Sequence, residues 1–139
     1  MSPWPKWLQP EDPQAHLRLG RRGEEAARSE LERLGMRTLC ANYRHGRGEI
    51  DLIVRDQEVL AFVEVKSRSS ESWVRPAQAV GRQKQKILSD TALAYLNELG
   101  RPAVAFRFDI VEVLFAGSEV REVRHIPDAF PLANGRMYR

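Results

Sequence analysis

The centre of the chain reads GEIDLIVRDQEVLAFVEVKS from Gly48 to Ser67. Two runs rich in Val, Ile, Leu and Phe, residues 49–55 and 59–67, stand on either side of the polar residues Asp56 and Gln57. Apolar and β-branched runs joined by a short polar turn are typical of an antiparallel hairpin. The sequence therefore predicts two neighbouring buried strands, and the other elements are expected to assemble around this hairpin.

The predicted hairpin carries charged side chains where apolar ones are expected. Neighbouring side chains of a strand point to opposite faces, which predicts two sets in the first strand: Ile50, Leu52 and Val54 on one face, and Glu49, Asp51 and Ile53 on the other. In the second strand Glu64 and Lys66 share a face, so Asp51 and Glu64 can meet across the hairpin. An unpaired charge in so apolar a strand would cost on the order of several kcal/mol, which points to a function for these residues.

The flanking sequence predicts two helices and further strands. Residues 16–34 carry one helix face at steps of three and four positions, formed by Leu17, Gly20, Glu24, Ala27, Leu31 and Leu34. After the hairpin, Pro76 opens a helical pattern that runs to Leu99, with Gly81 as a potential break. Three more strands are expected, at residues 36–43, 104–115 and 119–126. This order predicts an α/β fold with a mixed central sheet flanked by helices.

Each predicted helix also carries a charge on its apolar face. Glu24 lies within the apolar stripe of the first helix, and Lys84 lies between Val80 and Leu88 in the stripe of the second. Both side chains are expected to point inward, toward the charged face of the hairpin. Four separate elements therefore direct charged groups to one region of the predicted fold.

A divalent cation is the simplest way to hold three carboxylates together. Glu24, Asp51 and Glu64 would repel one another, and a shared low-dielectric site would raise their pKa values unless a cation neutralised them. Ligand sets made of oxygen alone suit Mg²⁺ or Mn²⁺. The single cysteine, Cys40, and three scattered histidines provide no zinc-binding cluster. The sequence therefore predicts a magnesium or manganese site.

Several motifs occur in an order that resembles a known family. They are Gly23-Glu24, Asn42-Tyr43-Arg44, the strand motifs at 48–53 and 62–66, Lys84, and Arg107-Phe108-Asp109. The two strand motifs resemble the D…ExK signature of the PD-(D/E)XK nuclease superfamily. The whole set is similar to the YraN-type family of small bacterial proteins, which are mostly labelled as endonucleases by motif. The resemblance covers residues 17–115.

What the resemblance implies is a restriction-endonuclease-like fold, similar to archaeal Holliday-junction resolvases, and phosphodiester cleavage that uses Mg²⁺ or Mn²⁺. In the mechanism that we hypothesise, Asp51 and Glu64 hold the metal together with the backbone carbonyl of Val65. Glu24 supports the metal or its water, and Lys66 completes the catalytic set by holding the attacking water or the phosphate. The number of metal ions, one or two, stays open.

The overall charge of the chain favours an anionic partner. There are 22 Lys and Arg residues against 19 Asp and Glu residues, which gives a formal net charge of +3 and a pI near 9.3. The residues predicted to contact nucleic acid are Lys84, Gln83, Arg44, Arg47, Arg68 and Arg82. Phosphate contacts position a nucleic acid without reading its sequence. We therefore expect DNA that is recognised by its structure, such as junctions, ends or branches.

Simpler interpretations stay open for individual residues. Glu64 and Lys66 could form an ion pair on a solvated sheet face. Glu24 could pair with a nearby arginine, and Lys84 could reach solvent from the start of its helix. Asp109 alternates with apolar neighbours and is interpreted as structural.

Two other classes of function also stay open. One is a non-catalytic nucleic-acid-binding protein that retains the nuclease fold. The other is a protein-interaction module that uses a Pro-rich arm with Trp4 and Trp7. A metal-dependent cleavage assay separates the first from an enzyme, and deletion of the arm tests the second.

Composition divides the chain into an arm (residues 1–15), a nuclease-like domain (16–127) and a C-terminal tail (128–139). No run approaches the ~18 consecutive apolar residues that span a membrane, and the first residues lack the apolar core of a secretion signal. We therefore expect a cytoplasmic protein with no membrane association. A homodimer is plausible, because cutting both strands of a duplex needs two sites.

Overall fold

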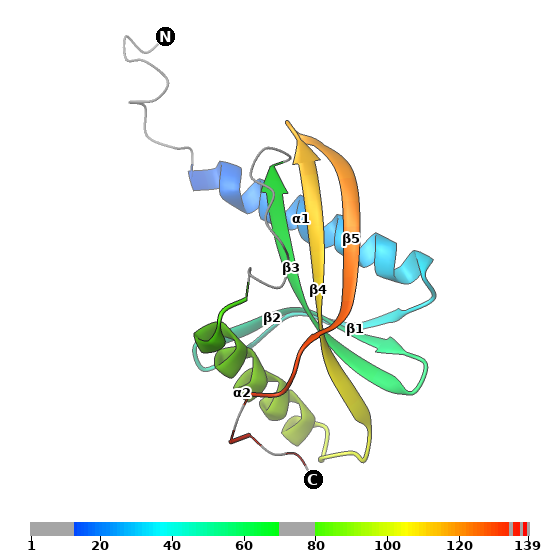
Figure 1. Cartoon of the computed structure of the whole chain (residues 1–139), viewed down its shortest axis with the longest axis vertical. Coiled ribbons are helices and arrows are strands. Elements are labelled where there is room, and N and C mark those ends of the chain that lie inside the picture. Colours follow the sequence, from blue (N-terminus) through cyan, green and yellow to red (C-terminus); the bar gives the residue numbers. More distant parts are fainter. Residues whose placement is uncertain (1–12, 70–79, 134, 137, 139) are drawn as a thin grey trace.

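The computed structural model describes residues 13–69, 80–133, 135, 136 and 138. Its elements are, in order, α1 (Pro13–Arg33), β1 (Arg37–His45), β2 (Gly48–Asp56), β3 (Val59–Ser69), α2 (Arg82–Glu98), β4 (Ala105–Ala116) and β5 (Glu119–Phe130). The strands form one sheet in the order β1-β2-β3-β4-β5 (Figure 1). Neighbouring strands are antiparallel except β3 and β4, which are parallel and are connected through α2.

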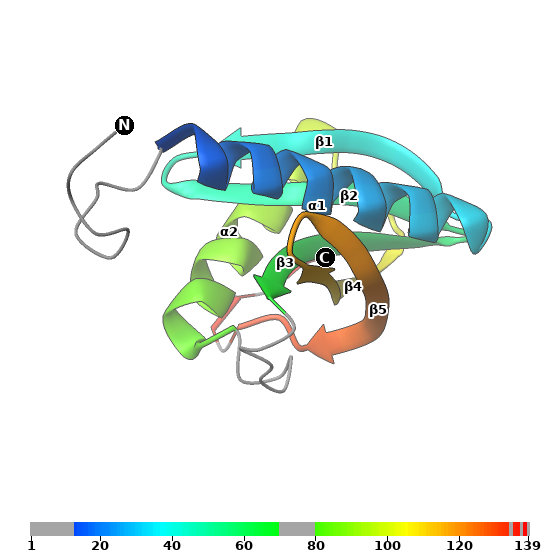
Figure 2. The ribbon, with the colours of Figure 1, turned by 90° about the horizontal axis from the view of Figure 1, so that it is seen from above.

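The two helices pack on opposite faces of the sheet, as the view from above illustrates (Figure 2). Ala27 and Leu31 of α1 pack on one face, in a cluster that includes Leu52 and Val63. The cluster beneath α2 is formed by Leu88, Ala92 and Leu96 of the helix and by Ile53, Phe62, Phe108 and Phe130 of the sheet. The predicted α/β fold class is confirmed, and the arrangement is consistent with a restriction-endonuclease-like fold.

The predicted hairpin is confirmed in β2 and β3, which pair in antiparallel orientation. Asp56 pairs with Val59 at the end of the ladder. The turn is therefore formed by Gln57 and Glu58, and the prediction of Asp56 and Gln57 as turn residues is wrong by one position. Gln57 has a φ of 55°, in the left-handed region that such tight turns require.

Several elements differ from their predicted limits. α1 begins at Pro13 and β5 ends at Phe130, so regular structure extends past the predicted domain limits at residues 16 and 127. Within the described residues the second helix begins at Arg82, because Gly81 is extended, with φ −76° and ψ 171°. Its predicted start, Pro76, and residues 1–12 of the predicted arm lie outside the described residues. Among the described residues there is no helix with the length and apolar character that crossing a membrane requires.

The alternation of side chains along β2 is interrupted at Asp51. Leu52 and Val54 pack in the cluster beneath α1, whereas Ile50 packs in the cluster beneath α2. The prediction that Ile50 shares a face with Leu52 and Val54 is therefore wrong. The ladder between β2 and β3 ends at Leu52, and the Val65 amide instead donates to the Asp51 carboxylate at 2.8 Å. A hydrogen bond to a side chain thus replaces the backbone ladder where the charged residues begin.

Two glycines allow the helices to approach the sheet closely. A methyl group on Gly23 of α1 would lie 2.0 Å from Ser67 Oγ in β3. A methyl group on Gly48 of β2 would lie 1.9 Å from Thr91 Oγ1 in α2. Both distances are far inside van der Waals contact, so a larger residue would push the helix away. Glycine at these positions brings both helices close to the charged hairpin.

Replacing Gly48 with alanine should destabilise the protein by about 2 kcal/mol. Thr91 is buried and its hydroxyl donates to the Ile87 carbonyl at 2.7 Å, so the added methyl group would force α2 away from β2. Urea denaturation followed by circular dichroism measures the loss. Gly20→Ala is the matched control, because its methyl group would meet no atom within 4 Å. This control should stabilise α1 by roughly 0.5 to 1 kcal/mol, and equal stability of Gly48→Ala and wild type would contradict the close packing.

Candidate active site

Three carboxylates from α1 and β2 gather beside the hairpin. Glu24, Glu49 and Asp51 each place a carboxylate oxygen within 4.8 Å of the others. Glu24 comes from the helix that lies across the sheet (Figure 2), and the other two come from alternate positions of β2. In the part of the chain that the structure describes, this is the one such group of three acidic, histidine or cysteine side chains. The structure therefore brings together two of the three predicted acids and adds Glu49.

Asn42 of β1 holds two of these acids in place. Its side-chain nitrogen lies 3.2 Å from both carboxylate oxygens of Glu24 and 3.0 Å from Glu49 Oε1. The backbone of Asn42 has a φ of 53°, a left-handed conformation that asparagine adopts more readily than most residues. Arg44 adds an ion pair to Glu49, with 3.2 Å between Nε and Oε2. Neighbours on β1 thus orient the acids before any ligand binds.

Asp51 is held where its charge is disfavoured. Burial, followed by the charge of Glu64, raises the pKa of the Asp51 carboxyl to about 7. The hydrogen bond from the Val65 amide acts in the opposite direction, and Glu24 and Glu49 each add a smaller upward effect. Near neutral pH this carboxyl is balanced between its protonated and charged forms. A nearby cation would favour the charged form.

Glu64 of β3 lies within reach of two lysines. The residue is 7% exposed, and burial raises the pKa of its carboxyl, whereas the charges of Lys84 and Lys66 act to lower it. Lys66 Nζ lies 3.5 Å from Glu64 Oε1, and Lys84 Nζ lies 3.9 Å from the same atom. The second oxygen, Oε2, is buried and has no hydrogen-bond partner. Two cations from different elements therefore meet one carboxylate that retains an unpartnered oxygen.

The donor set of this site fits a hard divalent cation. A positive charge would satisfy the unpartnered buried oxygen of Glu64 and would stabilise the charged form of Asp51. Carboxylate oxygens are the ligands that Mg²⁺ and Mn²⁺ prefer. The residues that could hold such an ion are Asp51 and Glu64, with Glu24 and Glu49 beside them.

The sequence prediction omits Glu49 and Asn42. Glu49 could have been found from its spacing, because it lies two positions before Asp51 and is expected on the same strand face. Asn42 gives no comparable signal, since its contacts depend on a left-handed backbone and on a helix distant in sequence. Val65 was predicted to contribute its carbonyl oxygen, and the structure places its amide N–H at Asp51.

The residues predicted to contact nucleic acid fall into two groups. Arg44 and Arg68 are paired with acids, Arg44 with Glu49 and Arg68 with the buried Glu112 at 3.0 Å. Burial raises the pKa of Glu112, and the charge of Arg68 opposes this effect. The remaining residues lie exposed or half-exposed on the surface: Arg47, Arg82, Gln83 and Lys84. Within this second group Gln83 is uncharged and Lys84 lies near Glu64. Arg47 and Arg82 therefore carry the exposed positive charge that has no ion-pair partner among the described residues.

A further buried acid, Asp109, belongs to a separate ionic network. Its carboxylate accepts hydrogen bonds from Arg107 Nε at 2.9 and 3.1 Å and from the Asp128 amide at 2.9 Å, and His125 Nε2 lies 2.7 Å away. Burial alone would raise the pKa of Asp109, but the bonds from His125 and Arg107 outweigh it and hold the pKa below its usual range. These contacts agree with the structural interpretation of Asp109.

The sequence is similar to a family of bacterial proteins. The profile of the family described as "Uncharacterised protein family UPF0102" matches residues 23–113. A UPF0102 protein of Syntrophus aciditrophicus is 44% identical over 121 residues, which cover 87% of this chain and 94% of the relative. UPF0102 proteins of Desulfosudis oleivorans and Pelotomaculum thermopropionicum are 41% and 40% identical, over 79% and 81% of this chain and 89% and 94% of the relatives. The matched region includes all the acids and lysines of the candidate site.

Proposed function

This chain belongs to the uncharacterised family UPF0102, and from the geometry of its acidic site we propose that it is a metal-dependent nuclease of the PD-(D/E)XK type. The observation that carries the proposal is the state of Glu64. Its Oε2 is buried without a hydrogen-bond partner, while its Oε1 lies near Lys66 and Lys84. An unpartnered buried acceptor is costly, and a cation bound beside Glu64 would remove this cost. A site that binds a cation through Glu64 and a phosphate through Lys66 and Lys84 would explain this arrangement of charges.

In this proposal Asp51 and Glu64 hold a divalent cation, and Glu24 supports it together with Glu49. When bound, Mg²⁺ or Mn²⁺ would supply Lewis-acid activation of water and would offset negative charge on a phosphodiester. Asn42 keeps Glu24 and Glu49 oriented toward Asp51. The Val65 backbone fixes the Asp51 carboxylate through its amide.

The two lysines act on the substrate. With the charge of Glu64 neutralised, the ammonium groups of Lys66 and Lys84 become available to the scissile phosphate. Lys66 lies closer to Glu64 and is the group that holds the attacking water or a phosphate oxygen. Lys84, assisted by Gln83, grips the phosphate from α2. Together they would stabilise the additional charge of the transition state.

The proposed substrate is DNA that is recognised by its structure, such as junctions, ends or branches. Support comes from the net charge of +3 and from exposed basic residues near the site, including Arg47 and Arg82. Contacts to phosphates follow the shape of a nucleic acid and carry no sequence information. Cleavage of both strands of a duplex would need two sites, so a homodimer belongs to this proposal.

A non-catalytic nucleic-acid-binding protein is the second candidate. It is favoured by the contacts of Asn42 and Arg44, which already provide partners for Glu24 and Glu49 without a metal. Incubation with Mg²⁺ or Mn²⁺ and with duplex, single-stranded, flapped and four-way DNA separates the two candidates. Cleavage that requires the metal and is lost in Glu64→Gln supports the nuclease. Binding without metal-dependent cleavage of any substrate would support the second candidate.

Mn²⁺ should raise the thermal stability of the wild-type protein independently of any cleavage. At a hundredfold excess over the dissociation constant, binding to the folded state alone contributes about 2.7 kcal/mol. Glu64→Gln should lose most of this stabilisation, because it removes a charged ligand. Glu119→Gln, which alters an exposed acid at the first position of β5, is the matched control and should respond as wild type. Differential scanning calorimetry with and without Mn²⁺ makes the comparison, and an equal shift in Glu64→Gln would exclude Glu64 as a ligand.

A further inference from the structure

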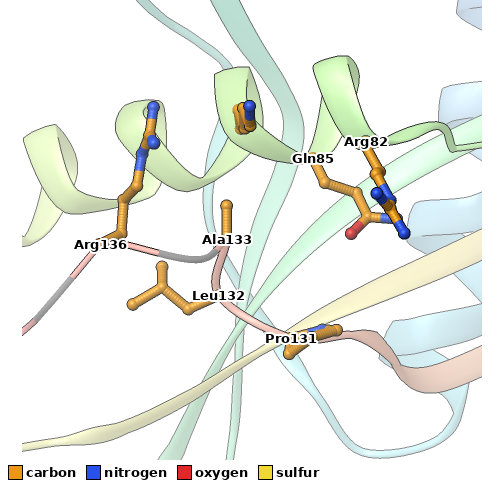
Figure 3. Close-up of a pocket in the computed structure, with 7 residues that line it drawn as sticks. Arg82, Gln85, Pro131, Leu132, Ala133 and Arg136 are labelled. Carbon is orange, nitrogen blue, oxygen red and sulfur yellow. The ribbon is translucent and has the colours of Figure 1, made fainter.

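A cavity of about 380 Å³ lies between α2 and the C-terminal segment that follows β5. We call it the tail cavity, and it is lined by Arg82, Gln85, Lys86, Pro131, Leu132, Ala133 and Arg136. Figure 3 shows Arg82 and Gln85 at one end, the segment 131–133 along the side and Arg136 at the other end. The wall from α2 lies within the family match, whereas residues 131–136 lie beyond its end at residue 113.

The C-terminal wall of the tail cavity is anchored to the core of the protein. The Ala133 amide donates to the hydroxyl of Ser89, which is fully buried in α2, at 2.9 Å. Arg136 forms two hydrogen bonds with Asp90, at 2.8 and 3.0 Å. Further along, Tyr138 donates to the Pro102 carbonyl. The C-terminal wall of the cavity is therefore fixed in place by hydrogen bonds to α2 and to the segment after it.

The tail cavity has an excess of positive charge. Arg136 is neutralised by Asp90, but Arg82 and Lys86 have no carboxylate partner among the described residues. Among the residues that the structure describes, no aspartate or glutamate lines the cavity. Cations that share a concave surface repel one another, and a bound anion removes this repulsion. The charge distribution thus favours an anion with several acceptor oxygens, which is the chemistry of a phosphate group.

The position of the tail cavity relates it to the active site. Residues two apart on a helix point in nearly opposite directions, so Arg82 and Lys86 lie on the side of α2 away from Lys84, which reaches Glu64. A helix with its side chains is roughly 10 to 12 Å across. One strand of DNA carries a phosphate per roughly 3.4 Å of its axis. Because the backbone also winds around that axis, the width of α2 corresponds to at most about three nucleotides.

We propose that the tail cavity binds a backbone phosphate of the substrate, within about three nucleotides of the bond that is cut. This inference rests on the proposed nuclease function and adds a second phosphate site to it. α2 then carries two phosphate contacts on opposite sides, Lys84 at the active site and the pair Arg82 and Lys86 at the tail cavity. Pro131, Leu132, Ala133 and Arg136 complete the second contact, and these residues lie beyond the end of the family match.

The test measures binding of fluorescently labelled four-way and duplex DNA by anisotropy over a range of salt concentrations. All proteins carry Asp51→Asn, so that binding is read without cleavage. The double variant Arg82→Ala/Lys86→Ala should bind about tenfold more weakly, and its slope of log affinity against log salt should be smaller by about one, since one phosphate contact is lost. The matched control is Arg37→Ala/Arg121→Ala, which removes the same charge from exposed positions on β1 and β5 and should have a much smaller effect.

Several outcomes would overturn the inference. Unchanged affinity and salt slope in the double variant would overturn it, as would an equal loss in the control variant, because net charge would then explain the effect. Inorganic phosphate is a separate probe: if it stabilises only proteins with an intact tail cavity while DNA binding ignores the cavity, the site takes a small free anion. A failure of the parent protein to bind any DNA would overturn the proposed function as well. Circular dichroism of each variant verifies the fold.

Discussion

Replacement of Asp51 by asparagine should abolish metal-dependent cleavage, with a loss of at least about a hundredfold. The change removes the charge that would hold the cation but retains an oxygen to accept the hydrogen bond from the Val65 amide. The shape of the side chain is also retained. The measurement is cleavage of labelled four-way DNA with Mn²⁺, in excess enzyme and on a single-turnover timescale. Cleavage by Asp51→Asn at the wild-type rate would exclude Asp51 from the catalytic site.

The same variant should be more stable than the wild type when metal is absent. The pKa of Asp51 lies at about 7 in the folded protein, above its usual value of 3.8, chiefly because the residue is buried and next because Glu64 is near. As pH rises from about 4 to about 7, the unfolded chain releases a proton that the folded protein retains, so the free energy of unfolding falls. Above pH 7 both states are ionised and this contribution stays constant.

At pH 8 in EDTA, Asp51→Asn should therefore unfold with about 1 to 3 kcal/mol more free energy than wild type. Near pH 4 the difference should nearly vanish, because Asp51 is then protonated in the folded protein. Urea denaturation at the two pH values measures both numbers. Glu119→Gln removes one exposed negative charge and should show no such pH dependence. A variant that is less stable than wild type at pH 8 would contradict the raised pKa.

Asp109→Asn should have the opposite effect and destabilise the protein by about 3 kcal/mol. Asp109 is 0% exposed and is bonded to Arg107, His125 and the Asp128 amide, so loss of its charge weakens all three of these contacts in the interior. Its pKa is held below the usual value, which means that the stabilisation is present above about pH 4 and is lost as pH falls through the folded pKa.

Urea denaturation at pH 7 measures the loss in Asp109→Asn, and the difference from wild type should shrink at pH 3. Asp56→Asn is the control within the same network, because Asp56 bonds the same Arg107 at 3.0 Å but is more exposed. It should cost only about 1 kcal/mol. Folded Asp109→Asn should retain cleavage activity. An Asp109 variant as stable as wild type, or folded and inactive, would contradict a structural role.

Local sequence patterns were sufficient to predict the elements and their order. The hairpin follows from two apolar runs and a polar turn between them, and the parallel pair of strands follows from the helical pattern between β3 and β4. Glu24 and Lys84 were identified because charge interrupts an apolar helix face. These features depend on neighbours within a few residues along the chain, which is why the sequence alone reveals them.

Local sequence patterns could not predict the contacts between segments that are far apart in the chain. The break in alternation at Asp51 depends on an amide of β3, and the contacts of Asn42 with Glu24 depend on how α1 lies over β1. The predicted break at Gly81 is confirmed, because Gly81 is extended and α2 begins at Arg82, whereas the predicted start at Pro76 lies outside the described residues. Docking of the C-terminal segment on Ser89 had no sequence signal, because a serine inside a helix usually has no such partner.

The order of the strands in the sheet indicates which strand pairs form first during folding. β1, β2 and β3 pair with chain neighbours through short turns, so this meander can form early from local contacts. The pairing of β3 with β4 closes a much longer loop and should form later. Glu24 can join Glu49 and Asp51 only after α1 has docked across the finished sheet. A cation bound as proposed would therefore slow unfolding more than it speeds folding, and it would act chiefly on the lifetime of the folded state.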